Sequence, residues 1–383
     1  MSVKPSLYST IIIESRDGRT ADVRLGVVSF DYYEDVLCPT LSAKLQIANV
    51  AGLISDSTGK VASLYDGMKL RGGEAVRIKV EPNSESNIPI DFLNKPLYIR
   101  GVNNVIRKAQ KEFFELSLVS LEAVENEVKF LYKSFPKETP ISDHVSSIVS
   151  DNFSDPGEFT PDRTSNTLGF IGNQMHPFEM LIRLASKSVP SSTGNSSAGF
   201  FFFQTREGFQ FKSVDTLLSQ SPKASYFYTE VNVNSVDFRP TPDLPSPDLK
   251  IINYEILKNQ DLVAQLKKGA YSTARKFLDP YTQRVTSRAQ DFLGSEFVSG
   301  IQNLGQKLDE LDITLTGANI PFTELPSQIL TEVFDLGTVS KGVETGFNSD
   351  PMEYIAQRKM RYNTLFTQVV SMMVPLNSNL HAG

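Results

Sequence analysis

Side chains that commonly catalyse reactions or bind metals are scarce in this sequence. Its 383 residues include three histidines (His144, His176 and His381), one cysteine (Cys38) and no tryptophan. No His-x-x-x-His or Glu-x-x-His spacing accompanies the histidines, so the pattern of a zinc site is missing. A lone cysteine beside Pro39 favours a small apolar side chain over a disulfide or a reactive thiol. We therefore expect no catalytic residue, no metal and no cofactor.

Two glycine-containing segments share only part of a known catalytic pattern. Gly52 and Gly59 are too far apart for a phosphate-binding loop, and Val61 stands where that loop needs Ser or Thr. The segment 194–199 lacks both the glycine spacing of a nucleophile elbow and a preceding apolar strand. Both segments are interpreted as loops or hairpins.

Neighbouring carboxylates form a third candidate for chemistry. Glu122 lies near Glu125, and Asp309 lies near Glu310 and Asp312. A glycosidase needs two carboxyl groups about 5–9 Å apart across a cleft, a distance that a sequence does not give. We interpret these carboxylates as solvated faces.

Composition and charge indicate an ordinary folded protein. Apolar residues make up 40% and charged residues 21%, with a formal net charge of −6. An acidic balance argues against a role in neutralising phosphates, because nucleic-acid affinity depends on clustered Lys and Arg. No apolar run approaches the ~18 residues of a membrane span, and no signal-peptide pattern opens the chain. The length favours two or three domains. We expect the protein to act inside a cell or in a particle assembled inside one.

The residues from Ile11 to about Leu121 are typical of strands. Segments 41–47 and 76–80 alternate apolar and polar residues, which predicts a sheet with one solvated face. Further strands are predicted at Ile11–Ile13, Leu97–Ile99, Val105–Ile106 and Phe114–Leu118. Hairpin turns are predicted at Asp17-Gly18, Asp66-Gly67 and Gly72-Gly73. Many short strands favour a sandwich or barrel.

The segment from Glu122 to about Ser221 has a mixed pattern. One apolar stripe predicts a helix begun by Thr139-Pro140, and a second stripe predicts a helix begun by Pro177. The two stripes are Ile141, Val145, Ile148, Val149 and Phe178, Leu181, Ile182, Ala185. Residues 199–212 predict a hairpin. This part is therefore expected to be a mixed α+β module.

A third region begins near Tyr226. Alternation predicts a strand over 228–233, and the prolines of 240–247 exclude regular strand pairing after it. Strands are also predicted over Ile251–Leu257 and from Leu365 to Pro375, and a helix from Asp350-Pro351 to about Tyr362.

A basic segment between Asp261 and Arg288 stands out in an acidic chain. It can be a solvated face or a docking surface for an acidic partner, with Phe277, Leu278 and Tyr281 as apolar anchors. The residues of this candidate partner interface are Lys267, Lys268, Arg275, Lys276, Phe277, Asp279, Pro280 and Tyr281.

Three short runs in the third region resemble one phage protein family. They are Tyr254–Asp261, Gly269–Tyr271 and Phe277–Thr282. These runs are similar to the central segment of baseplate hub proteins from T-even-type contractile-tailed phages, especially their cyanophage relatives. The order of parts agrees, since the family's first barrel ends in a strand similar to Phe114–Leu121. The likeness covers most of the chain, and its motifs are structural rather than catalytic.

The resemblance implies a mainly β fold with α+β insertions. It assigns residues 1–121 to an N-terminal tail-tube-like β-barrel, 122–225 to a mixed α+β module and 226–383 to a second tail-tube-like β-barrel. A Pro-rich and basic insertion at about 239–349 interrupts the second barrel.

For function, the resemblance implies a non-enzymatic hub of the phage tail baseplate. Three copies form a homotrimeric ring that presents six barrels to the hexameric tail tube, keeps threefold symmetry towards a trimeric spike and lets DNA pass. The implied partners are the tail tube or tube-initiator protein above, the spike protein below and baseplate wedge proteins outside. No sequence-specific nucleic-acid binding and no membrane insertion are implied. The implied location is the virion baseplate, assembled in the host cytoplasm.

One departure from the family concerns the C-terminus. In the family, an Asn-Leu-x-x-Gly turn is followed by strands that close the second barrel, whereas this sequence ends at Asn379–Gly383. Because an open sheet edge promotes aggregation, we expect an incomplete C-terminus rather than closure by another protein.

Other functions stay open. One alternative is the hub of a phage-derived contractile injection system, which a fused spike domain would identify. A tail-associated cell-wall hydrolase belongs to a different class, and the lack of a His-based site argues against it. A glycan-binding module would lack tryptophan, the commonest ring for sugar stacking.

Overall fold

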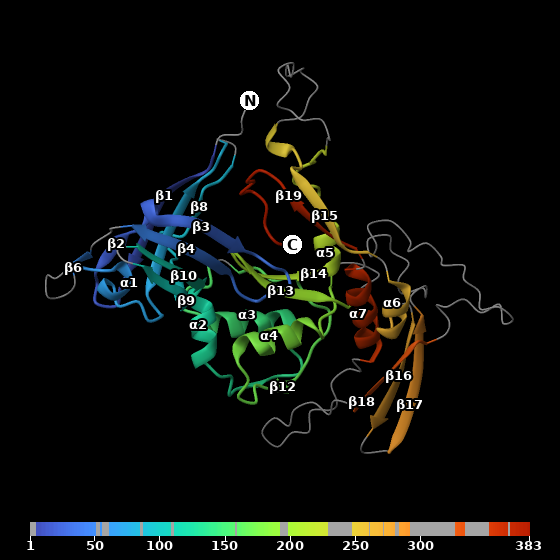
Figure 1. Ribbon diagram of the computed structural model, residues 1–383. Helices are drawn as coiled ribbons and strands as arrows, with labels where there is room; N and C mark the ends of the chain where they lie inside the picture. Colours follow the sequence, from blue (N-terminus) through green and yellow to red (C-terminus); the bar gives the residue numbers. More distant parts are fainter. Residues whose placement is uncertain are drawn as a thin grey trace.

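A large antiparallel sheet forms the N-terminal part of the molecule (Figure 1). The computed structural model describes residues 5–50, 54–55, 61–84, 87–108, 111–157, 159–191, 198–228, 247–259, 261–270, 272–279, 283–291, 326–333, 352–366 and 368–383. Within these residues the fold is mainly β with a few helices, which confirms the predicted fold class.

The strand order of this sheet is β2-β1-β7-β9-β10-β4-β3, with β8 added to β7. Its strands are β1 (Leu7–Glu14), β2 (Thr20–Asp22), β3 (Val27–Tyr33), β4 (Ser42–Val50), β7 (Ala75–Glu81), β8 (Ile90–Asp91), β9 (Leu97–Lys108) and β10 (Lys111–Val119). A separate pair, β5 (Ile54–Ser55) and β6 (Val61–Ala62), lies beside α1 (Leu64–Gly67).

The alternating residues of the sheet form one apolar core, as predicted. Ile11, Leu45, Ile78 and Phe114 are each fully buried in it, although they come from four different strands. Burial of one face of each strand fixes the register, because a shift by one residue would turn these side chains to solvent. The sheet is therefore held by apolar packing as well as by its ladders.

Three details differ from the expectations for this region. Asp17-Gly18 does connect β1 to β2, but Asp66-Gly67 belongs to helix α1 rather than to a hairpin. The Ser63 hydroxyl accepts a hydrogen bond from the Asp66 amide at 3.2 Å. This N-cap bond stabilises the start of a helix where a hairpin turn was predicted. Gly72-Gly73 leads into β7 without pairing two strands. The strands predicted at 97–99 and 105–106 are one strand, β9.

A module of helices and short strands follows the sheet. Both predicted helices and the predicted hairpin are confirmed. Its elements are α2 (Leu121–Val128), β11 (Ser134–Phe135), α3 (Ile141–Asn152), β12 (Phe170–Ile171), α4 (Pro177–Ala185), β13 (Phe200–Thr205), β14 (Gly208–Ser213) and α5 (Val214–Leu218). The prediction of the buried face of α4 is wrong in one residue, because Ile182 is 46% exposed while Met180 and Leu184 are buried.

The C-terminal region forms two small sheets. In the first, β15 (Asn253–Lys258) pairs antiparallel with β19 (Val369–Met373). In the second, β16 (Ser272–Asp279) lies between antiparallel β17 (Arg284–Asp291) and parallel β18 (Gln328–Val333). The helices of this region are η2 (Pro247–Leu249), α6 (Leu262–Lys267) and α7 (Met352–Leu365).

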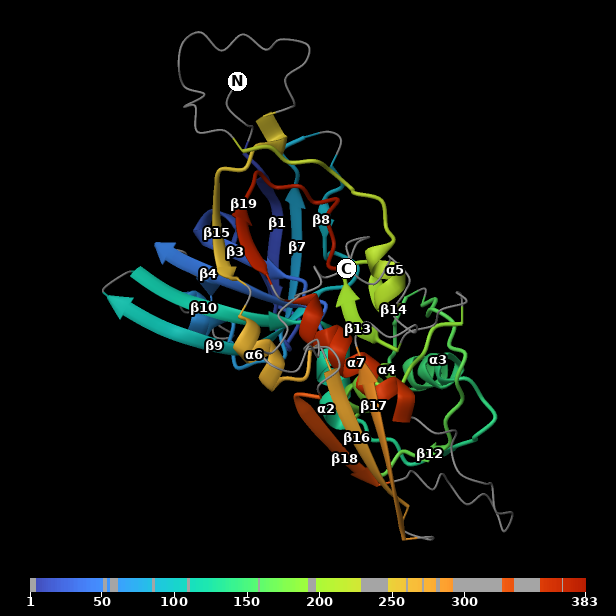
Figure 2. The same ribbon diagram turned by 90° about the vertical axis from the view of Figure 1, so that its right-hand side faces the viewer.

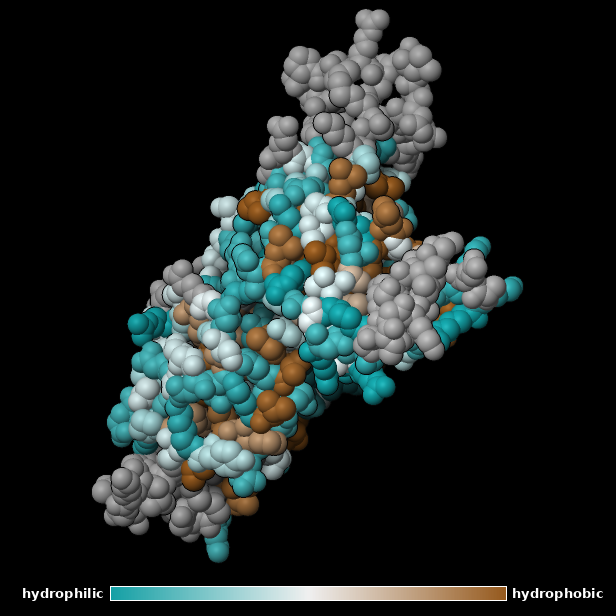
Figure 3. Space-filling view, turned by 90° about the vertical axis from the view of Figure 1, so that its left-hand side faces the viewer, coloured by the Kyte–Doolittle hydropathy of each residue, from teal (hydrophilic) through white to brown (hydrophobic). Residues whose placement is uncertain are grey.

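The second small sheet lies beside α7 and points away from the N-terminal sheet (Figure 2). The strand predicted over 251–257 and the helix and strand predicted after residue 350 are confirmed by β15, α7 and β19. The predicted strand at 228–233 lies outside the described residues from residue 229 on. The proline cluster of 240–247 lies outside them up to residue 246. Viewed from the side of the N-terminal sheet, the described surface is largely hydrophilic with separate apolar patches (Figure 3).

Candidate functional site

Two of the three histidines have structural roles, because their rings bond to backbone carbonyl groups. The His144 ring is buried, and its Nε2 lies 3.0 Å from the carbonyl oxygens of both Pro136 and Leu168. Burial lowers the pKa of His144, so the ring stays neutral and carries its proton on Nε2. His176 Nδ1 lies 2.8 Å from the Asn126 carbonyl oxygen, which ties the start of α4 to α2. Each ring therefore joins two backbone segments.

The residues of the candidate partner interface lie on α6 and β16. Lys267 ends α6 and Lys268 caps it, and both are exposed. Residues 275, 276, 277 and 279 belong to β16, where the Lys276 side chain is exposed. The other three side chains of that group, together with Pro280 and Tyr281, lie outside the described part of the chain.

A first polar seam joins the N-terminal sheet to the module through Gln204, on β13. Its Oε1 accepts hydrogen bonds from the Leu41 amide at 3.1 Å and the Ser120 hydroxyl at 2.8 Å. Its Nε2 donates to the Glu122 carboxylate at 3.1 Å. Gln204 and Glu122 are both buried, so the expectation that Glu122 lies on a solvated face is wrong. The carboxylate is buried because a side chain distant in sequence supplies its donor.

A second seam joins α7 to the module. The Arg361 guanidinium is buried and forms an ion pair with Asp215 of α5, with Nη2 2.6 Å from Oδ1. The next residue, Tyr362, donates its hydroxyl proton to the Phe200 carbonyl and accepts from the Phe200 amide at 3.1 Å. Burial raises the pKa of Tyr362, so this hydroxyl stays a donor. These bonds hold α7 against the edge of the β13–β14 hairpin.

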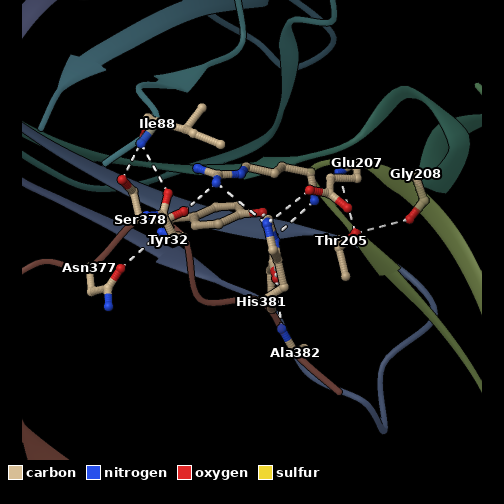
Figure 4. A network of polar contacts seen from close by, with 12 residues as sticks. Tyr32, Ile88, Thr205, Glu207, Gly208, Asn377, Ser378, His381 and Ala382 are labelled. Carbon is tan, nitrogen blue, oxygen red and sulfur yellow. Dashed lines mark hydrogen bonds and ion pairs between the residues drawn. The ribbon is translucent and has the colours of Figure 1, made fainter. Parts of the chain in front are cut away.

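A third seam is made by residues 376–382, which cross from the N-terminal sheet to the module (Figure 4). On the sheet side, the Ile88 amide donates to Asn379 Oδ1 at 3.1 Å, and the Ser378 hydroxyl donates to the Ile88 carbonyl at 2.5 Å. On the module side, Arg206 donates to the Ser378 carbonyl oxygen. The tail is thus bonded to both units.

Charged groups meet at the centre of this third seam. The Glu34 carboxylate accepts from the Ala382 amide at 2.9 Å, the Arg206 amide at 3.0 Å and the Tyr32 hydroxyl at 2.5 Å. The His381 ring lies between two carboxylates, with Nδ1 3.5 Å from Glu34 and Nε2 3.2 Å from Glu207. Burial and the nearby Glu34 charge raise the pKa of Tyr32. This arrangement suits a fixed joint between chain segments.

Little in the sequence indicates the three seams. Gln204, Arg361 and Glu34 each contact a partner more than a hundred residues away along the chain. A polar residue within the apolar run of β13, such as Gln204, was the one available signal. In the part of the chain that the structure describes, no group of three His, Cys, Asp or Glu side chains could hold a metal ion. Among the described helices, none has the length and apolar character needed to cross a membrane.

Comparisons with known proteins give similarities at low identity. No protein-family model matches the chain, and no curated protein matches its sequence. A tail protein from Neisseria meningitidis is 11% identical, with a TM-score of 0.44, over 85% of this chain and 71% of its own. The 43 kDa tail protein of prophage MuSo2 from Shewanella oneidensis is 8% identical, with a TM-score of 0.47, over 96% and 82%. The Francisella PdpA-VgrG complex gives 7% identity and a TM-score of 0.40, over 91% and 43%.

Proposed function

We propose that this chain is a structural component of a phage tail, the hub of its baseplate. The observation that carries the proposal is the set of three polar seams, which fasten two separate β units to one module. The two β units are the N-terminal sheet and the β15–β19 pair. The second of them contains most of the run Tyr254–Asp261, whose residues resemble the baseplate hub family.

Symmetry explains what two β units in one chain can do. A contractile-tail tube is a stack of hexameric rings, whereas the spike below it is trimeric. We propose that each β unit belongs to one of two tail-tube-like barrels, so that three copies offer six barrels to the tube and keep threefold symmetry towards the spike. The seams matter here because a ring of this kind needs both units of each copy in a fixed relation. We propose this homotrimeric ring as the hub.

The ring has to let DNA pass without retaining it. A net charge of −6 gives a phosphate backbone no general attraction to the protein. We propose a hub without enzymatic activity that contacts the tail tube, the spike and the wedge proteins in the virion. Its role is mechanical and depends on rigid joints rather than on a reactive side chain.

Two measurements test this proposal. Antibodies raised against the chain should label the baseplate end of virions of the phage that carries this sequence, as seen by electron microscopy. Light scattering on the isolated protein should give three times the chain mass of 42.6 kDa. Labelling of the capsid or of the tail shaft, or a monomer at micromolar concentration in an otherwise folded sample, would contradict the proposal.

A further inference from the structure

A cavity of about 440 Å³ lies where the N-terminal sheet meets the module. Its walls come from β8, the start of β9 and the segment between them, from the start of α2 and from the β13–β14 turn. It opens to solvent beside Lys95 and Asp155, whose exposed side chains form an ion pair at 3.2 Å. Cavities that bind small ligands measure about 300–1,000 Å³, so this one has room for a small molecule or a single side chain. We call this space, which Phe92, Leu121 and Gln204 line, the junction cavity.

The Glu122 carboxylate is the buried charged group in the wall of the junction cavity. Glu122 is 8% exposed, and its Oε2 accepts a hydrogen bond from Gln204 Nε2 at 3.1 Å. Its other oxygen, Oε1, has no hydrogen-bond partner among the described residues and is not fully enclosed by the chain. This oxygen is therefore an acceptor that the cavity offers to a ligand. Asp91, at the exposed rim, adds a second negative charge.

The two basic residues that line the junction cavity are engaged elsewhere. Lys95 pairs with Asp155 and also donates to the Asp155 carbonyl at 3.1 Å. Arg206 donates to the Ser378 carbonyl oxygen in the third seam. Glu122 lies in the first turn of α2, where the helix supplies only a partial positive charge. Among the described residues, no Lys or Arg forms an ion pair with Glu122, and a buried carboxylate without a cation is costly.

The rest of the wall is partly apolar. Leu41, Phe92 and Leu97 line the junction cavity and are buried members of the core of the sheet. An aliphatic stem can therefore lie against this wall while a charged end reaches the carboxylate, as the stems of lysine side chains do on apolar surfaces. The cavity thus combines one unpaired negative group with an apolar surface.

We propose that the junction cavity binds a primary ammonium group on an aliphatic stem. A guanidinium fits less well, because its fork needs both carboxylate oxygens and Oε2 of Glu122 already accepts from Gln204. A metal ion fits less well too, because the described residues offer it no group of three His, Cys, Asp or Glu side chains. A free alkylamine and a lysine side chain of another protein share the required chemistry. The inference goes beyond the hub and does not depend on it.

Methyl NMR of the full chain, labelled at leucine, tests the proposal. The charged probes are butylammonium and Nα-acetyl-lysine N-methylamide, and the uncharged match is 1-butanol. We expect butylammonium to shift the methyl signals of Leu41, Leu97 and Leu121 and to bind about tenfold more tightly than 1-butanol. Binding of the lysine probe as well would identify a lysine side chain as a ligand, and binding of butylammonium alone would identify a free amine.

Two variants assign the binding to one carboxylate. Glu122→Gln removes the charge and keeps an acceptor for Gln204, so the preference for butylammonium over 1-butanol should disappear. Glu127→Gln is the matched control, because Glu127 is exposed on the same helix and does not line the cavity, and the preference should persist. Circular dichroism checks that both variants are folded. The comparison of butylammonium with 1-butanol uses the unmodified protein, so it is decisive even if a variant does not fold.

Four results would overturn the proposal. They are the absence of shifts at the three leucines, equal affinity for butylammonium and 1-butanol, an unchanged preference in folded Glu122→Gln, and displacement of butylammonium by millimolar Ca²⁺. Antibody labelling of virions and light scattering do not involve the junction cavity. Failure of the ammonium site is therefore distinguishable from failure of the hub.

Discussion

The module and the C-terminal region are stabilised in different ways. In the module, large rings pack directly on one another, as Phe178, Phe202 and Phe209 do with ring centroids 5.2–6.1 Å apart. Among the described residues of 247–383, the fully buried apolar side chains are Ala270 and Met360. That region is attached through the Arg361–Asp215 ion pair and the tail seam instead.

This difference has a physical consequence. The free energy gained by burying apolar side chains does not depend on their orientation and scales with the buried area. The module is therefore stabilised by its own core. A buried ion pair contributes little net free energy compared with an apolar contact, yet it fixes one geometry because each donor needs its acceptor. The C-terminal region is therefore positioned by a few polar groups, and apolar side chains such as Leu257 and Val333 stay exposed.

The largest expected effect comes from the core of the module. Phe211 is fully buried in it, so Phe211→Ala should lower the free energy of unfolding by about 3–5 kcal/mol. The matched control is Phe130→Ala, at a ring that is 42% exposed, where about 1 kcal/mol or less is expected. Urea unfolding followed by circular dichroism measures both. Equal losses would show that burial in the module core is not what stabilises the module.

The next effect tests the ionic attachment of α7. Arg361→Met leaves the Asp215 carboxylate partly buried without its cation, which should cost about 3 kcal/mol. Hydrogen exchange should then rise in α7 and β19 while the module core stays protected. Arg183→Met, at an exposed position of α4, is the control. If exchange rises equally in α3 and α4, α7 is part of the module core and the comparison fails.

A smaller effect is expected at the seam between sheet and module. Gln204→Ala removes the acceptor of the Leu41 amide and the Ser120 hydroxyl, which should cost about 2 kcal/mol. Because each unit keeps its own core, we expect this variant to unfold in two urea transitions and the unmodified protein in one. Gln210→Ala on β14, where Gln210 is less buried, serves as the matched control. A single shifted transition would show that the two cores unfold together.

The smallest effect is a pH dependence from His144. Burial lowers its pKa below the ordinary value of 6.5, so the unfolded chain binds a proton more readily than the folded chain. Stability should therefore fall as pH drops below about 6.5, and the fall should end at the folded pKa. His144→Gln should flatten this slope in urea titrations between pH 7.5 and roughly 5. An unchanged slope would assign it to other groups.

The sequence by itself determined the local elements. Alternation in segments 41–47 and 76–80 predicted strands, and the stripes after Pro140 and Pro177 predicted helices, because period and burial are properties of neighbouring residues. Only part of the candidate site could be predicted from the sequence. The exposed Lys276 lies where a docking surface was predicted, but its aliphatic neighbours Ile329 and Val333 come from a distant strand.

Only the tertiary structure decided which polar side chains are buried and which apolar side chains are exposed to solvent. Glu122 looked solvated and Ile182 looked buried, and both expectations were wrong because the deciding neighbours lie far along the chain. The Leu41–Gln204 bond spans 163 residues, and the Glu34–Ala382 bond spans 348. Period and composition describe a residue's neighbours in sequence, whereas burial and hydrogen bonding depend on neighbours in space.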